Sequence, residues 1–458
     1  MSYPKDFLWG AATSAFQYEG AADEDDKGWS VADERCSWKK QQQADTLTAS
    51  DGYHHVEEDV MLMKKLGLRS YRFSISWARL YPDGDGELNW KGISYYQRLI
   101  QLLNENQIEP IVTLLHFDIP WALVQNYEGF LDRRCVEAFE RYCRTCFELF
   151  GSQVKYWLTI NEQNIMAMMP EMCGISNEDP DRERKLAQIN YHMYLANAKA
   201  VILCHRLLPG AMIGPCVSYP TLYPETCHPK DIAIAYEMEE RMAFAPMETY
   251  VYGMIPAYVL KSWEKKGYKP KQSQEDMDIL KMGVADYLGV NWYCTQTVGM
   301  STQGVAMNIG VEVKVKQNPY LEYGEWGWSY DPKAFKMALK ECYARYRKPI
   351  MVCENGWSEI EELEGEEVHD QKRIAYLRDH INSMKEAIEE GVPVIGYQHW
   401  SFMDILSSSQ GFEKRYGLIY VDREEFDMKQ CKRYPKDSFY EYQKIIQLNG
   451  NLSELDKK

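Results

Sequence analysis

The sequence lacks any uncharged apolar run of about 18 residues, the length that a transmembrane helix needs. Its first residues also contain no apolar segment long enough for a signal peptide, so we expect an unexported, cytoplasmic protein. The chain also lacks a positive charge balance, because its 52 Lys and Arg are outnumbered by 68 Asp and Glu, and the formal net charge is -16 at pH 7. A chain of this charge is repelled by nucleic acid and by anionic membrane surfaces, and neither is expected as a partner.

The twelve cysteines do not have the spacing of a disulfide framework or of a zinc site. Cys204, Cys216 and Cys353 lie in apolar runs where a small hydrophobic residue would serve, which indicates free thiols. The pair Cys143 and Cys146 has C-x-x-C spacing but lies in a helical pattern, without a second pair. The sequence also lacks a His-Glu-x-x-His motif, a phosphate-binding glycine loop and a dinucleotide fingerprint. We therefore expect no metal and no cofactor.

The 458 residues instead show a regular alternation of short apolar runs and longer amphipathic segments. A long polar loop to about residue 50 follows the first apolar run. Helical patterns include one from Val56 to Leu66, which Gly67 ends in the manner of a left-handed cap, and others over 133–150, 189–208, 331–346 and 372–389. The candidate strands are 7–14, 69–75, 111–115, 154–160, 212–217, 287–291, 349–353 and 394–397.

Eight strands that alternate with helices, with no linker or change of composition between them, predict a single (β/α)8 barrel domain over residues 1–458. The chain is longer than a minimal barrel of about 250 residues, and insertions after the strands account for the excess. A doubly wound open sheet with a second domain is the alternative. That fold would need a glycine-rich first turn, which is missing.

Polar residues stand where the predicted strands end. The clearest case is the apolar run that leads to Glu354, because a carboxylate that ends a buried strand is costly to desolvate without a function. Glu162 ends a second strand in the same way. In a closed barrel the carboxyl ends of all strands meet at one face. That face would bring together Gln17, Arg72, His116, Asn161, Glu162, Asn291, Tyr293, Glu354 and Trp400.

Two carboxylates among neutral hydrogen-bonding groups, with an aromatic side chain and no metal ligands, suit glycoside hydrolysis. That reaction needs one carboxyl group that donates a proton and one ionised carboxylate that attacks the sugar. Structural roles are the alternatives: His116 and Trp400 could be core residues, and Asn161 could cap a helix. The placement of all of them at the same end of successive strands favours the functional interpretation.

At these positions the sequence closely resembles glycoside hydrolase family 1, the family of β-glucosidases and 6-phospho-β-glycosidases. The resemblance covers nearly the whole chain, and its motifs together are highly specific. They are Phe7-Leu-Trp-Gly-Ala-Ala-Thr-Ser, Gln17-Tyr-Glu-Gly-Ala, Tyr71-Arg-Phe-Ser-Ile-Ser-Trp, His116-Phe-Asp, Asn161-Glu and Glu354-Asn-Gly.

The resemblance implies a retaining mechanism in which Glu162 is the acid/base and Glu354 is the nucleophile. It also implies that Arg72 and Tyr293 lie beside the nucleophile, and that Arg72 keeps Glu354 ionised. Gln163, where Pro is frequent, and Cys353, where Thr is usual, depart from the family pattern without removing a proton carrier. The residues implied to hold the sugar hydroxyls and ring are Gln17, His116, Asn161 and Trp400.

The segment 400–422 contains a second difference from the usual family pattern. Family members that act on unmodified sugars usually have Glu-Trp where this chain has Ser407-Ser408. Ser407, Lys414 and Tyr416 are instead similar to the residues with which the phospho-glycosidase branch holds a 6-phosphate. A cation and two hydroxyl groups suit a phosphate that carries about -1.5 to -2 charge, so we expect Lys414 at the rim of the sugar pocket. The alternative is a polar surface loop with an ordinary Lys-Arg pair.

The sequence therefore predicts a 6-phospho-β-glucosidase that acts on phosphorylated disaccharides or aryl glucosides. A small residue at Ser408 favours gluco over galacto substrates, while a 6-phospho-β-galactosidase or a dual enzyme stays open. A β-glucosidase for neutral sugars is a further alternative, and a non-catalytic sugar-binding protein is a third. The aglycone site would be formed by variable loops such as 164–180 and 297–330, and formation of a homo-oligomer is left open.

Overall fold

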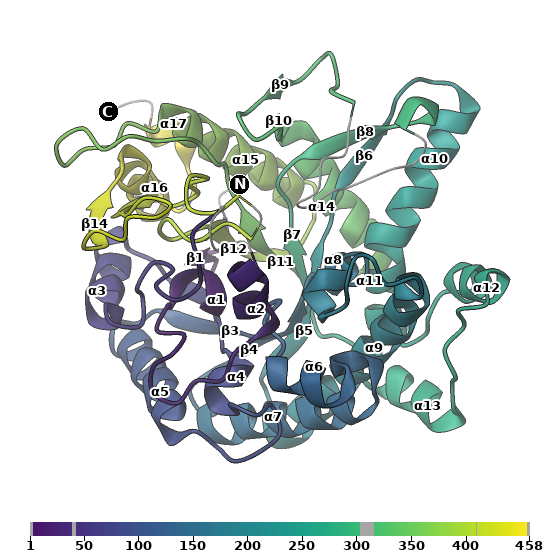
Figure 1. Ribbon diagram of the computed structural model, residues 1–458. Helices are drawn as coiled ribbons and strands as arrows, with labels where there is room; N and C mark the ends of the chain where they lie inside the picture. Colours follow the sequence, from purple (N-terminus) through teal and green to yellow (C-terminus); the bar gives the residue numbers. More distant parts are fainter. Residues whose placement is uncertain (1–2, 39–42, 303–315, 409, 456–458) are drawn as a thin grey trace.

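The computed structural model describes residues 3–38, 43–302, 316–408 and 410–455 (Figure 1). Its centre is a closed barrel in the order β1-β12-β11-β7-β5-β4-β3-β2, and the neighbouring strands are parallel. The predicted (β/α)8 barrel is confirmed, whereas its description as one domain stays a prediction. The barrel strands are β1 (Leu8–Ala12), β2 (Ser70–Ser74), β3 (Glu109–Leu115), β4 (Tyr156–Asn161), β5 (Met212–Ser218), β7 (Leu288–Asn291), β11 (Ile350–Asn355) and β12 (Val394–Trp400).

Helices surround the barrel as an outer ring (Figure 1). The helix α3 buries Val56, Val60 and Met63, at the spacing of one helical face, and ends at Gly67 in the left-handed conformation (φ 85°), as predicted. The main helices of the ring are α3 (Val56–Leu66), α5 (Trp90–Glu105), α7 (Arg134–Phe150), α9 (Arg182–Leu207), α11 (Ala245–Tyr252), α14 (Pro332–Tyr346), α15 (Gln371–Glu389) and α16 (Asp437–Gln447).

The connections between these elements contain further short helices and strands. The segment predicted as a long polar loop before residue 50 holds a helix over residues 31–38, because Val31, Ala32 and Cys36 are buried in the core. The inserted helices are α1 (Ala15–Tyr18), α2 (Val31–Trp38), α4 (Trp77–Leu80), α6 (Trp121–Tyr127), α8 (Gln163–Met166), α10 (Pro229–Glu239), α12 (Ala257–Lys266), α13 (Gln274–Met282) and α17 (Leu452–Leu455). The small strand pairs are β6 (Thr221–Pro224) with β8 (Thr295–Val298), β9 (Glu322–Tyr323) with β10 (Ser329–Tyr330), and β13 (Ile419–Asp422) with β14 (Lys432–Pro435).

Apolar side chains fill the inside of the barrel. They form a cluster separate from the core between barrel and helices, and this cluster includes two of the cysteines. The thiols of Cys143 and Cys146 are buried on α7 and are free. The inner cluster consists of Ile111, Leu158, Cys216, Tyr287, Met351 and Cys353.

Strand pairing is irregular where β4 and β11 approach the carboxyl end of the barrel. The register of β4 on β5 shifts between Leu158 and Asn161, and the register of β11 on β7 shifts between Val352 and Glu354. Such irregularities redirect the side chains that follow them. The two strands that carry Glu162 and Glu354 are thus locally distorted at the carboxylates.

The first strand closes the barrel between two strands that are far apart in the sequence. β1 pairs with β2 on one side and with β12 on the other. The end of the chain also packs on it: Asn449 Oδ1 accepts a hydrogen bond from Trp9 Nε1 (3.0 Å), and the hydroxyl of Tyr442 donates to the carbonyl of Gly10 (2.8 Å). Closure therefore joins residues from both ends of the chain.

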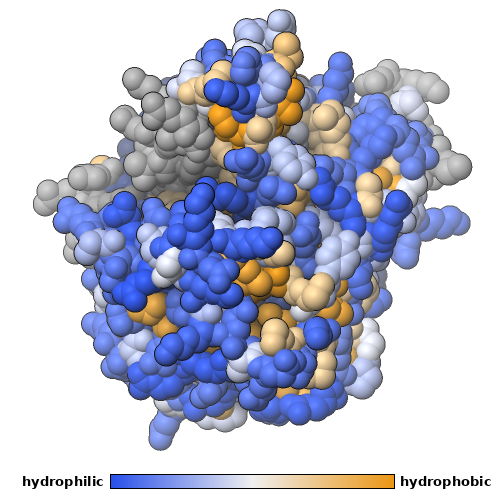
Figure 2. All heavy atoms as spheres, turned by 90° about the vertical axis from the view of Figure 1, so that its right-hand side faces the viewer, coloured by the Kyte–Doolittle hydropathy of each residue, from blue (hydrophilic) through white to orange (hydrophobic). Residues whose placement is uncertain are grey.

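Among the described residues, no helix is both long and apolar enough to cross a membrane. Hydrophilic side chains cover most of the face in Figure 2, and the hydrophobic ones form separate small patches. Charged residues make up 26% of the chain, an ordinary proportion for a globular protein, and they account for much of this hydrophilic surface.

Candidate active site

The two carboxylates predicted to carry the chemistry both lie at the carboxyl end of the barrel. Glu354 is part of β11, and Glu162 follows β4 directly. Glu162 has a left-handed backbone (φ 45°), which is unusual for a residue other than glycine. Its N–H donates to the carbonyl of Cys216 (2.7 Å) and so ties this turn to β5. Both side chains are buried, with residue exposures of 7% for Glu162 and 4% for Glu354.

Glu354 is surrounded by donors. Its Oε1 accepts from Arg72 Nη1 (2.6 Å), and its Oε2 accepts from the hydroxyl of Tyr293 (2.5 Å). Burial raises the pKa of Glu354, while Arg72 and the hydrogen bonds from Tyr293 and Asn291 lower it. The contact expected from Arg72 is present. The charge of Arg72 favours the ionised carboxylate, as expected, but burial outweighs it, so the pKa of Glu354 stays above its usual value.

Glu162 has a different environment. Its Oε1 accepts one hydrogen bond from Asn291 Nδ2 (2.8 Å), and it has no ion pair with a cation in the described part of the chain. Burial raises the pKa of Glu162 to about 8, with a further contribution from the negative charge of Glu354. The carboxyl group of Glu162 is therefore protonated at neutral pH, and it can donate a proton. The pair thus combines a proton donor with a carboxylate that is paired to an arginine.

His116, Asn161 and Trp400 form a neutral polar wall beside the carboxylates. Asn161 Oδ1 accepts from Arg72 Nη2 (2.7 Å), and Asn161 Nδ2 lies 3.2 Å from His116 Nε2. The imidazole is stacked on the Trp400 ring with centroids 5.8 Å apart. Burial, and then the charge of Arg72, hold the pKa of His116 well below its usual value, so the ring is neutral. His116 Nδ1 has no hydrogen-bond partner among the described residues, which leaves one polar atom for a ligand.

Gln17 connects the first strand to the segment 400–422. Its Nε2 donates to the carbonyl of Leu406 (2.6 Å), and its Oε1 accepts from Ser14 Oγ (2.7 Å). The amide is therefore engaged with the protein at both ends, although Nε2 keeps a second hydrogen. Sugar binding by Gln17 stays a prediction.

The structure places Ser407, Lys414 and Tyr416 together. Ser407 Oγ lies 3.2 Å from the hydroxyl of Tyr416, and Lys414 Nζ lies 5.5 Å from the centroid of the Tyr416 ring. Lys414 is only 3% exposed and makes no ion pair with any described carboxylate. Burial lowers the pKa of Lys414 to about 7. The alternative of a solvated surface loop is wrong, because Lys414 and Arg415 are both buried, and Lys414 lies deeper than the rim position that was expected.

An aromatic residue that sequence reasoning missed links this group to the carboxylates. The centroid of Trp328 lies 4.0 Å from Lys414 Nζ, 5.9 Å from the Tyr416 ring and 4.8 Å from the ring of Tyr293, which donates to Glu354. The signal in the sequence is the aromatic run 326–330, in an insertion that precedes α14. The loop 297–330 was expected only to shape the aglycone site, and its residues 303–315 lie outside the described part.

Buried ion pairs hold the segment that carries Ser407, Lys414 and Tyr416. Asp404 accepts from Arg415 Nη1 (2.8 Å), from Lys436 Nζ (2.7 Å) and from the N–H of Gly417 (3.0 Å). Removing one member of such a network leaves an uncompensated buried charge. Asp404 therefore holds the buried side of this segment in place through these contacts.

Gln163 and Cys353, which differ from the usual residues of the family, make no side-chain hydrogen bond to either carboxylate in the described part of the chain. Gln163 is fully buried: its Nε2 donates to Asn190 Oδ1 (2.7 Å), and its Oε1 accepts from the hydroxyl of Tyr250 (2.6 Å). Cys353 contributes its carbonyl oxygen, which accepts from Arg72 Nη1 (3.1 Å). Neither residue carries a proton in the proposed chemistry, and a tuning role for them stays a prediction.

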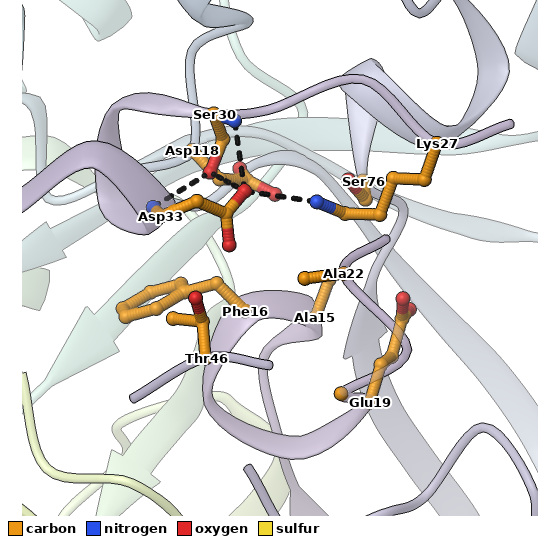
Figure 3. A pocket seen from close by; sticks show the side chains of 11 residues that line it. Ala15, Phe16, Glu19, Ala22, Lys27, Ser30, Asp33, Thr46, Ser76 and Asp118 are labelled. Carbon is orange, nitrogen blue, oxygen red and sulfur yellow. Dashed lines mark hydrogen bonds and ion pairs between the residues drawn. The ribbon is translucent and has the colours of Figure 1, made fainter. Parts of the chain in front are cut away.

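A cavity of about 10 Å³ is lined by α1 and the segment after it, and Lys27, Asp33 and Asp118 lie at its wall (Figure 3). Lys27 Nζ donates to Asp33 Oδ2 (2.8 Å) at its edge. This volume has room for about one water molecule, so a sugar does not fit there. Within the described ranges, no three His, Cys, Asp or Glu side chains form a group that could hold a metal ion.

Comparisons with known proteins agree with this geometry. A family model described as glycosyl hydrolase family 1 matches residues 1–451. The chain is 40% identical to the aryl-phospho-beta-D-glucosidase BglC of Bacillus subtilis and 35% identical to the 6-phospho-beta-glucosidase AscB of Escherichia coli, each alignment covering 98% of both proteins. Its structure matches a beta-glucosidase from Thermotoga maritima in complex with castanospermine, with a TM-score of 0.88 and 31% identity, over 98% of this chain and 99% of the other.

Proposed function

Because the chain belongs to glycosyl hydrolase family 1, we propose that it hydrolyses 6-phospho-β-D-glucosides to glucose 6-phosphate and an aglycone. The observation that carries this proposal is the ammonium group of Lys414, which is buried beside Ser407 and Tyr416 without an ion pair to any described carboxylate. A buried cation without a counter-ion is costly, and a phosphate dianion would compensate it. Relatives named as phospho-glucosidases over nearly their whole length support the same substrate class.

In the proposed mechanism Glu354 attacks the anomeric carbon while Glu162 donates its proton to the leaving oxygen. Glu162 then accepts a proton from the water that releases the sugar, and the β configuration is retained. Arg72 and Tyr293 support this assignment because they donate hydrogen bonds to Glu354, whereas Glu162 makes no ion pair with a cation among the described residues and burial raises its pKa. The separation of about 5 to 5.5 Å between the two carboxyl groups that a retaining enzyme needs stays a prediction.

Two alternatives differ in the sugar. A neutral β-glucosidase is suggested by the structural match to the beta-glucosidase from Thermotoga maritima, but it would gain nothing from an uncompensated Lys414. A 6-phospho-β-galactosidase would use the same phosphate site and would differ at the pocket around one hydroxyl group. A non-catalytic sugar-binding protein would not need two carboxylates with such different surroundings.

The wild-type enzyme should cleave an aryl 6-phospho-β-glucoside with a kcat/KM about 100-fold or more above that for the same aryl β-glucoside without phosphate. The reason is that a charge-assisted hydrogen bond contributes about 1.5 to 3 kcal/mol, which a neutral 6-hydroxyl does not gain. Side-by-side steady-state rates measure this, with the 6-phosphogalactoside as a third substrate. Comparable rates for the first two substrates would assign the enzyme to neutral glucosides, and a preference for the third would assign it to galactosides.

The pH dependence should differ between the two glucosides. With the unphosphorylated substrate, kcat/KM should fall as pH rises through about 8, where Glu162 loses the proton that it must donate. With the phosphorylated substrate, the fall should begin near pH 7, because Lys414 in the free enzyme loses its charge first. Profiles of kcat/KM measured from well below pH 7 to well above pH 8 test this. Identical upper limbs for both substrates would contradict a role of Lys414 in binding phosphate.

The sugar-binding roles of Gln17, His116, Asn161 and Trp400 are part of this proposal and rest on their position around the carboxylates. A cytoplasmic location and the absence of nucleic acid as a partner stay predictions from the sequence.

A further inference from the structure

The side-chain amide of Asn291 faces both proposed catalytic carboxylates, and its orientation matters for them. Its Nδ2 donates to Glu162 Oε1 (2.8 Å) and to Asn161 Oδ1 (3.2 Å), and its hydrogen bond to Glu354 lowers the pKa of that carboxyl group. Asn161 Oδ1 is an acceptor, because it also accepts from Arg72 Nη2 (2.7 Å). If the amide turned over, the oxygen of Asn291 would face the acceptor Asn161 Oδ1, and the ionised form of Glu162 would lose the hydrogen bond that stabilises it.

One donor in the described part of the chain holds the opposite side of this amide. Cys216 Sγ lies 3.0 Å from Asn291 Oδ1. Cys216 is on β5, where it pairs with Gly289, two residues before Asn291 on β7. Its side chain is completely buried in the inner layer of the barrel. Burial, followed by the neighbouring Cys353, raises the pKa of the Cys216 thiol, which therefore keeps its proton and remains a donor at neutral pH.

We propose that Cys216 is a positioning residue that fixes the orientation of the Asn291 amide and, through it, the proton affinity of Glu162. The thiol is a weak donor, but in this place it prevents a buried carbonyl oxygen from being left without a partner. Cys216 also accepts the N–H of Glu162 at its carbonyl (2.7 Å), so one residue holds both the backbone and, indirectly, the side chain of the acid/base. This inference rests on the proposed function only for the assignment of Glu162 as acid/base.

Several groups besides Asn291 act on Glu162. The charge of Glu354 on β11 raises its pKa, while Arg72 on β2 and a hydrogen bond from Ser218 on β5 lower it, and the hydroxyl of Tyr293 is also close enough to interact with its charge. In the described part of the chain, the side chain of Cys216 hydrogen-bonds to Asn291 and interacts with Cys353, and it makes no hydrogen bond to any of these groups. A shift in the pKa of Glu162 would then report the orientation of Asn291.

The test uses two pairs of variants at Cys216. The two side chains of each pair are similar in size, and only one of them carries a hydrogen-bond donor. Cys216→Ser and Cys216→Thr keep a hydroxyl donor, whereas Cys216→Ala and Cys216→Val remove it. We expect the Ala and Val variants to shift the upper limb of the pH profile to higher pH by about 0.5 to 1 unit, because Glu162 would hold its proton more tightly. They should also lower kcat about fivefold to tenfold, because Glu162 must lose its proton to act as a base in the second step. The Ser and Thr variants should have a pH profile and a kcat close to those of the wild type. Azide, which needs no base, should restore turnover in the Ala and Val variants.

Cys342→Ala is the control, because it removes another fully buried thiol, on α14, outside the site. It should leave the pH profile unchanged. A ¹³C NMR titration of protein labelled at glutamate carboxyl carbons follows Glu162 without turnover, so the inference can be tested even if 6-phosphoglucosides prove not to be substrates. If Ala matches Ser and Val matches Thr in both the titration and the rates, Cys216 only fills space and the proposal fails.

Discussion

Glu354→Gln is expected to lower kcat for an aryl 6-phospho-β-glucoside by about four orders of magnitude or more. A neutral amide cannot attack the anomeric carbon, so no covalent glycosyl-enzyme forms. The loss should be similar for good and poor leaving groups, because the missing step precedes both. Glutamine keeps the shape of the side chain and a hydrogen-bonding partner for Tyr293, so the barrel should remain intact. Steady-state rates and the burst of released phenol in the first turnover measure the effect.

The matched control is Glu162→Gln, which changes the other carboxylate in the same way. It should still release an activated phenol rapidly in the first turnover, since such a leaving group needs no proton. Later turnovers should be slow because no base activates water, and added azide should restore them. The division of roles between the carboxylates would be wrong if both variants lost the first turnover equally and azide rescued neither.

Lys414→Ala is expected to lower kcat/KM for the 6-phosphoglucoside by about 100-fold while changing the unphosphorylated glucoside by about threefold or less. The ammonium group is buried against Trp328, so its interaction with a phosphate is screened little by solvent. Losing a charge-assisted hydrogen bond of about 1.5 to 3 kcal/mol accounts for this magnitude. Parallel measurements on the two substrates give the ratio directly.

Lys414→Met separates charge from packing, because methionine keeps an apolar stem over the Trp328 ring but carries no charge. It should lose as much activity on the phosphorylated substrate as Lys414→Ala does. A proportional loss on both substrates in the two variants would mean that Lys414 supports the pocket structurally and does not recognise phosphate.

The sequence was sufficient for the barrel because most of its strands are apolar runs bounded by turn residues, and β2, which also contains Ser70, Arg72 and Ser74, keeps the same alternation with helices. It was also sufficient to place Glu162 and Glu354 at strand ends, since parallel strands bring their carboxyl ends to one face. The helix α2 was missed because its residues have no clear apolar face and are stabilised by packing rather than by local pattern.

Other features of the site depend on contacts that no local pattern encodes. Trp328 reaches Lys414 and Tyr416 from an insertion far away in the sequence. Burial of Lys414 and the net rise in the pKa of Glu354 follow from the surrounding atoms, not from the residue types. The position of Cys216 against Asn291 is set by strand register, which single-sequence reasoning does not resolve to one residue.

The position of β1 between β2 and β12 also sets the order in which the protein can fold during synthesis. At about 5 to 20 residues per second, a ribosome completes β12 roughly 20 to 80 s after β1. Throughout that interval β1 has an unpaired edge, which can pair with other chains or recruit a chaperone. A chain released between residues 355 and 393 would contain both Glu162 and Glu354 and yet have no closed barrel to bring them together.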